Sequence, residues 1–160
     1  MMTMIGKVAA VALTGFVLTA VGVYPQLSAR LTGDEIQLRV APVDPIDPFR
    51  GAYVDLQYPD LNRLGGPDQR GIEDGEPGDV FITLRQKGDV WVAGSWTRSR
   101  PENGLYLACS DRAWELRCGI ESWFLPQDEA AAMEEAVGEG AVATVKVDDR
   151  GYAAIVAVEG

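Results

Sequence analysis

The sequence predicts a mainly β (α+β) protein, in which an N-terminal transmembrane helix precedes an antiparallel β-sandwich or partial barrel with one short helix. Three observations predict this class. An uncharged apolar run opens the chain, runs of alternating apolar and polar residues follow it, and turn-forming residues separate those runs. We therefore divide the 160 residues into a membrane anchor with a juxtamembrane linker, 1–30, and a β-rich domain, 31–160.

The apolar run is Val8–Val23, and Lys7 and Arg30 flank it. A spanning helix needs roughly 17–25 residues, whereas the apolar part of a signal peptide has about 7–15. Extension to Met4–Tyr24 reaches spanning length if the Lys7 ammonium extends back to the interface. We predict an uncleaved single-pass anchor. The alternatives are a signal segment cleaved after Ala20-Val21-Gly22 and a buried core helix.

Charge and composition exclude several classes of function. The net charge is -10, and the residues from Leu31 onward contain 24 acidic and 12 basic side chains. A surface this acidic repels phosphate, so nucleic acid is not expected as a partner. The chain has no histidine, which excludes histidine-dependent triads and histidine-ligated zinc. We expect no cofactor.

The alternating runs predict about eight strands. They are Ile36–Val40, Tyr53–Tyr58, Val80–Leu84, Val90–Val92, Leu105–Cys109, Trp114–Ile120, Val142–Val147 and Tyr152–Val158. Turns at 86–89, 110–112 and 148–151 predict three hairpins among them. Gly94 indicates a bulge that lets Trp91 and Trp96 share a face. Asp128 and Gly138 delimit the one predicted helix of the domain.

Residues 59–79 are rich in glycine, proline and charge and show no periodicity. A loop of this length is either a mobile linker or a functional lid.

Cys109 and Cys118 fall on two runs that we expect to face each other across the second hairpin. A structural disulfide here would contribute roughly 2–3 kcal/mol through closure of a short loop. Two buried free thiols and a redox dithiol are the alternatives. The redox dithiol lacks the C-x-x-C spacing.

Asp44, Asp47 and Asp55 cluster in sequence around Arg50. The simplest interpretation is an ion pair across a tight turn. A calcium site and a pair of acid–base carboxylates are the alternatives, although no EF-hand loop is present.

The domain is rich in aromatic residues, which indicate core packing or an exposed patch for a partner or the bilayer surface. These are Tyr53, Tyr58, Trp91, Trp96, Trp114, Trp123 and Phe124.

The stretch from Gly33 to Tyr58 resembles the GDYXXLXY family, small bacterial membrane-anchored proteins in which a P-V-D-P-R-D-x-x-R-G-D-Y-x-x-L-x-Y run is typical. Tyr53, Leu56 and Tyr58 fall on the named motif positions. The stretch 119–126 is similar to the family's G-I-E-x-[YF]-F-V-P pattern. The chain has Ala52 and Ile46 where the family pattern has aspartate and arginine. These departures favour a scaffold role for the motif.

A second similarity concerns architecture only. The run Glu76–Val80 is similar to the β-domain of type I signal peptidases, but the serine and lysine that those enzymes need are not in the required motifs.

From the apolar anchor, the cysteine pair and the resemblance to the GDYXXLXY family, we predict a single-pass protein of the bacterial inner membrane with its domain on the periplasmic side. The domain is expected to be a protein-binding or accessory module for another envelope membrane protein. The alternatives are an envelope hydrolase that uses carboxylates around Asp44, Asp47 and Arg50, and a calcium- or small-ligand-binding module. No catalytic residue is assigned. The candidate binding positions are Asp44, Asp47, Arg50, Gly51, Tyr53, Leu56, Tyr58, Glu121 and Phe124.

Overall fold

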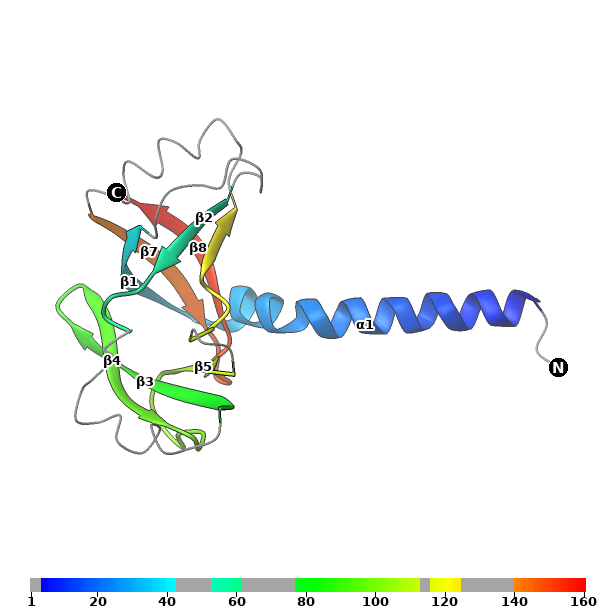
Figure 1. The fold of residues 1–160 in the computed structure, drawn as a ribbon, viewed down its shortest axis with the longest axis horizontal. Helices are drawn as coiled ribbons and strands as arrows, with labels where there is room; N and C mark the ends of the chain where they lie inside the picture. Colours follow the sequence, from blue (N-terminus) through cyan, green and yellow to red (C-terminus); the bar gives the residue numbers. More distant parts are fainter. Residues whose placement is uncertain (1–3, 43–52, 62–76, 113–115, 125–139) are drawn as a thin grey trace.

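The computed structural model describes residues 4–42, 53–61, 77–112, 116–124 and 140–160 (Figure 1). One long helix, α1 (Met4–Thr32), projects away from a β-rich domain. All described strand pairs are antiparallel. The predicted fold class is confirmed. The short helix expected between Asp128 and Gly138 lies outside the described residues, as does 62–76 of the predicted loop.

The described strands form two sheets. One has five strands in the order β6-β2-β1-β7-β8, and the other has three in the order β4-β3-β5. Their bounds are β1 Asp34–Pro42, β2 Tyr53–Gln57, β3 Asp79–Lys87, β4 Val90–Thr97, β5 Tyr106–Ser110, β6 Ser122–Phe124, β7 Ala141–Val147 and β8 Ala153–Glu159. Figure 1 shows the smaller sheet beside the larger one, with α1 leaving from the base of β7 and β8.

The two sheets share one apolar core. Ile36, Leu38 and Val40 are buried on one face of β1, as their alternation predicts, while Gln37 and Arg39 are exposed. The smaller sheet adds buried residues from β3 and β5, and β7 and β8 add alanine and valine from the larger sheet. Burial of these side chains is the main favourable term for the domain.

The first and third hairpins are confirmed. β3 and β4 are joined through Lys87 and Val90, which are paired, so this turn is shorter than the predicted 86–89. The predicted bulge is present, because Ile82 faces Trp96 whereas Leu84 faces Ala93. Trp91 and Trp96 therefore both pack against the core.

The second predicted hairpin is present only in part. Ser110 and Arg117 form an isolated antiparallel bridge, while β5 itself pairs with β3. Residues 113–115, with Trp114 at the start of the expected return strand, lie outside the described residues. Gly119 then adopts φ +83°, outside the extended region, and the backbone crosses to the other sheet. The following strand is β6, which pairs with β2. Alternation alone gave no information about which strand would be the partner.

The last two turns of α1 pack on the domain. Ala29 is fully buried, and Ser28 donates a hydrogen bond to the buried carboxylate of Asp148. Gly33 ends the helix, with its N–H bonded to the carbonyl of Ala29 at 2.9 Å. A Cβ at Gly33 would lie only 2.5 Å from that carbonyl oxygen and 2.8 Å from the backbone nitrogen of Val147, so glycine is required there. The helix thus passes into the sheet without a loose linker.

Candidate functional site around the motif strand

The structure brings together the two stretches that resemble one family. β2 carries the tyrosine–leucine motif and pairs with β6, with Tyr53 opposite Phe124 and Asp55 opposite Ser122. Leu56 and Tyr58 are 3% and 5% exposed and belong to the core. These two motif side chains therefore face the interior of the domain.

Two hydrogen bonds join the motif to the segment before β6. The Leu56 N–H donates to the carbonyl of Glu121 at 2.7 Å. The Tyr58 hydroxyl donates to the carbonyl of Ile120, also at 2.7 Å. Burial raises the pKa of the Tyr58 phenol, and the nearby Glu121 carboxylate raises it further. Tyr58 therefore stays neutral and remains a hydrogen-bond donor.

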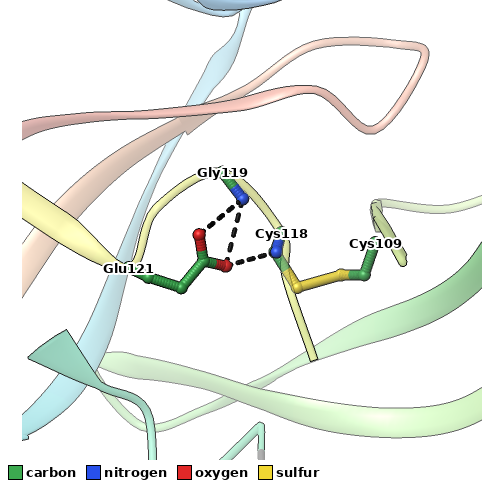
Figure 2. Close-up of a disulfide and its surroundings, with 4 residues drawn as sticks. All are labelled: Cys109, Cys118, Gly119 and Glu121. Carbon is green, nitrogen blue, oxygen red and sulfur yellow. Dashed lines mark hydrogen bonds between the residues drawn. A yellow bond between two sulfur atoms is a disulfide. The ribbon is translucent and has the colours of Figure 1, made fainter. Parts of the chain in front are cut away.

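Figure 2 shows how the segment itself is held. The Glu121 carboxylate turns back and accepts hydrogen bonds from the backbone N–H groups of Cys118 and Gly119, the latter at 3.1 Å. Cys118 is joined to Cys109 of β5 by a disulfide. The carbonyl of Gly119 accepts a hydrogen bond from Gln26 of α1 at 3.0 Å. One short turn thus contacts both sheets and the helix.

The sequence-predicted site residues have different outcomes. Asp44, Asp47, Arg50 and Gly51 lie outside the described residues, so their ion pair stays a prediction. Tyr53 is placed by its backbone in β2.

The remaining predicted residues are at the strand edge or in the turn. Asp55 is exposed and accepts a hydrogen bond from the Ser122 hydroxyl at 3.1 Å. Phe124 is 75% exposed at the end of β6, whereas Trp123 packs against the core. Core packing thus applies to Trp123, and a partner-binding role of Phe124 stays a prediction.

Sequence reasoning missed an ion pair beside the motif. Arg39 of β1 donates two hydrogen bonds to the carboxylate of Asp60, at 2.6 and 2.7 Å. Asp60 is 9% exposed, and its carbonyl accepts the N–H of Ala93 in β4. The signal in the sequence is an acid two residues after the buried Tyr58, but it falls within the stretch 59–79, whose composition predicts an irregular loop.

A second ion pair closes the end of the smaller sheet. Arg98 binds both carboxylate oxygens of Asp111, at 2.9 and 2.7 Å, and the Gly78 N–H donates to the same carboxylate at 2.7 Å. The Arg98 hydrogen bonds hold the pKa of Asp111 below its usual range, and the Gly78 N–H lowers it further. These contacts are structural, since they tie β3, β4 and β5 together.

Three of the described carboxylates hold parts of the fold together. Asp60 and Asp111 each bind an arginine, and Glu121 binds backbone N–H groups. No group of three or more histidine, cysteine, aspartate or glutamate side chains in the described ranges is placed to hold a metal ion.

Comparison with characterised proteins and with solved structures found no match. A comparison with protein families found one, described as GDYXXLXY protein, which matches residues 16–158. This match includes the second half of α1 and every described strand up to Val158 of β8. The chain therefore belongs to the GDYXXLXY family, and the two stretches that its structure pairs are those that carry the resemblance.

Proposed function

We propose that this protein is a single-pass membrane protein of the bacterial envelope whose β-rich domain, outside the cytoplasm, binds another membrane protein. The observation that carries the proposal is the length, apolar composition and exposure of α1. Gly6–Thr32 is long and apolar enough to cross a bilayer, and none of its most apolar window is buried against the domain. That exposure favours an anchor or a signal segment over a core helix.

The disulfide supports a location of the domain outside the cytoplasm. Disulfides persist in oxidising compartments such as the periplasm and are rare in the cytosol. Cys109 and Cys118 are bonded across the two halves of the domain. An extracytoplasmic domain would keep this bond.

A partner-binding role is supported by the edge of the larger sheet. β6 is at one end of the strand order, and Phe124 at its terminus is 75% exposed. An exposed aromatic side chain on an edge strand is a feature of surfaces that dock another protein. The neighbouring β2 is fixed by its buried motif, so this edge would be presented rigidly.

Cell fractionation with thiol labelling tests the topology. We expect full-length protein in the membrane fraction, degraded by protease added from the periplasmic side, with no thiol labelled until a reductant is added. Soluble cytosolic protein with two reactive thiols would overturn the proposal. A soluble periplasmic protein that lacks its N-terminal segment would show that this segment is a cleaved signal and not an anchor.

Site-specific photocrosslinking in membranes tests the partner. A photoreactive residue at Phe124 should crosslink to a membrane protein. Val156, which is 39% exposed on the opposite edge strand β8, is the matched control position. Equal crosslinking at both positions, or none at Phe124, would contradict a partner at this edge.

A further inference from the structure

The helix changes its surroundings near Tyr24. Residues 7–23 are exposed on every side of the helix, as expected of a lipid-facing span. Beyond it, one face packs on the domain through the buried Ala29, but the opposite face stays apolar and open. Leu27 is 50% exposed and Leu31 is 73% exposed. Their spacing of four residues puts them on one side of the helix.

The length of the span fixes the depth of these leucines. From Val8 to Leu27 an α-helix rises about 29 Å, close to the hydrocarbon thickness of about 30 Å. If the span is instead Met4–Val23, Leu27 lies about 6 Å beyond its end, still inside the headgroup layer. With either choice of span, Leu27 lies within the membrane or its interface. The same helical turn also packs on the β-domain through Ala29.

The turn between β7 and β8 reaches the same depth. Arg150 donates a hydrogen bond to the Tyr24 hydroxyl, and its guanidinium lies 5.4 Å from the centre of the Tyr24 ring. Amphipathic aromatic rings favour the headgroup region. The guanidinium that stacks on such a ring is therefore held at the level of the lipid phosphates, which it can bind through paired N–H groups.

Charged side chains of both signs lie near the helix exit. Three basic side chains gather where α1 meets the larger sheet. Lys146 donates to the carbonyl of Arg30 at 3.4 Å, Arg30 donates to the carbonyl of Ile155 at 3.2 Å, and Arg150 adjoins Tyr24. Among the acids beside them, Asp148 is buried and accepts the hydroxyl of Ser28, whereas Asp149 next to Arg150 and Glu35 opposite Lys146 are exposed. Basic groups close to a bilayer surface are attracted to its phosphates.

We propose that the domain rests directly on the bilayer through an interfacial seat made of Tyr24, Leu27, Leu31 and Arg150. In the seat the two leucines face the acyl chains and headgroups, and Arg150 binds a lipid phosphate. The occupant is lipid because the apolar face continues that of the span without a break. This inference rests on the membrane anchor of the proposed function, and it adds a fixed orientation of the domain on the membrane.

Spin labels on the full-length protein test the seat. Single cysteines replace Val17, Leu27, Asp149 or Asp89, with the native disulfide kept oxidised. The protein is reconstituted into vesicles of phosphatidylethanolamine and phosphatidylglycerol. Asp149 is exposed next to Arg150, and Asp89 lies in the turn between β3 and β4, on the side of the domain away from α1 (Figure 1). Accessibility to oxygen and to a water-soluble nickel chelate gives the depth of each label.

We expect depth to fall in the order Val17, Leu27, Asp149, Asp89, with the Asp149 label clearly less accessible to nickel than the Asp89 label. A Val17 label that is open to nickel would overturn the anchor itself, and the proposed function with it. If the Val17 label is protected from nickel but the Leu27 and Asp149 labels are as accessible to nickel as the Asp89 label, only the seat is overturned. A Leu27 label shielded from both reagents would indicate a second copy of the chain in place of lipid, and would also overturn it.

Solid-state NMR tests the phosphate contact in the same vesicles. Guanidinium nitrogens labelled with ¹⁵N should show dipolar contact with lipid ³¹P, and part of that signal should vanish in Arg150→Gln. Arg112→Gln, which changes an exposed arginine paired with Asp79, is the control and should leave the signal unchanged. Identical signals from the wild type and Arg150→Gln would exclude the contact.

Discussion

The hydroxyl of Tyr58 donates to the backbone carbonyl of Ile120 at 2.7 Å, across 62 residues of sequence. This bond joins the end of the motif strand to the turn that carries the disulfide. Both partners are buried, so neither can exchange the bond for water. The last tyrosine of the motif thus has a structural role that does not depend on any ligand.

Tyr58→Phe should lower the free energy of unfolding by about 1–2 kcal/mol, because the carbonyl of Ile120 loses its buried donor. Denaturant titration of the detergent-solubilised full-length protein measures this. Tyr152→Phe, a change at a half-buried tyrosine, is the control and should have a smaller effect. An unchanged unfolding midpoint in Tyr58→Phe would show that the bond contributes nothing.

The same variant should alter the response to alkali. Burial raises the pKa of Tyr58 in the folded state, while an unfolded tyrosine ionises near about 10. Above that pH the unfolded state loses a proton that the folded state keeps, so wild-type stability falls as pH rises. The stability difference between the wild type and Tyr58→Phe should therefore shrink above about pH 10. A constant difference would contradict the raised pKa.

Glu121→Gln should weaken the turn between the sheets. The Oε1 atom accepts the N–H groups of Cys118 and Gly119, and Oε2 also accepts that of Gly119, whereas an amide is uncharged and has an NH2 donor in place of one oxygen. We expect a loss of about 1–2 kcal/mol, as for hydrogen bonds to a charged group. Glu102→Gln is a matched control at an exposed glutamate. Equal stabilities for the two variants would remove the structural role of Glu121.

Much of the larger sheet could be predicted from sequence. Ile36, Leu38 and Val40 alternate strictly, so the local pattern predicts β1. The chain between β7 and β8 contains a clear turn, so the local pattern also predicts that these two strands pair. The bulge at Gly94 was predictable for a similar reason, since glycine interrupts an otherwise regular strand.

The partners of β5 and β6 could not be predicted, because pairing between distant strands leaves no local signal. Cys109 and Cys118 alternate in phase with a hairpin, yet the backbone at Gly119 leaves the extended region and β6 joins another sheet. The pair of Arg39 and Asp60 was missed for the same reason. Each residue looked ordinary in its own stretch, and only the fold brings them together.

Removal of the disulfide by Cys109→Ala with Cys118→Ala should lower the free energy of unfolding by about 2–3 kcal/mol, as expected for a loop with a sequence separation of 9. The turn also contacts Gln26 of α1, so limited proteolysis of the full-length protein should become faster there. Reduction of the wild type with a thiol reagent should reproduce both effects. Unchanged stability would show that the hydrogen bonds of Glu121 hold the turn in place without the disulfide.

Asp111→Asn should cost about 1–2 kcal/mol at neutral pH, because Arg98 would lose its charged acceptor. The lowered pKa of Asp111 means that the wild type keeps this advantage above about pH 4 and loses it as pH falls further. Asp79→Asn is the control, since its pair with Arg112 is exposed and should contribute less than about 1 kcal/mol. If the stability difference between the wild type and Asp111→Asn stays constant below about pH 4, the lowered pKa of Asp111 is contradicted.

Gly33→Ala tests whether the anchor and the domain form one unit. The new Cβ would lie 2.5 Å from the carbonyl oxygen of Ala29 and 2.8 Å from the nitrogen of Val147, and both are backbone atoms that cannot rotate away. The helix end must therefore move off β7, at a cost of about 1–3 kcal/mol as in other overpacked sites.

The expected result is a lower unfolding midpoint and greater motion of a spin label at Asp149, because the contacts of Ser28 and Tyr24 with the β7–β8 turn depend on that helix end. Gly15→Ala is the matched control in the same helix, since its Cβ would meet nothing within 4 Å. If Gly33→Ala behaves like Gly15→Ala in both measurements, the domain is attached to its anchor flexibly, and the orientation that we infer for it on the membrane has no structural basis.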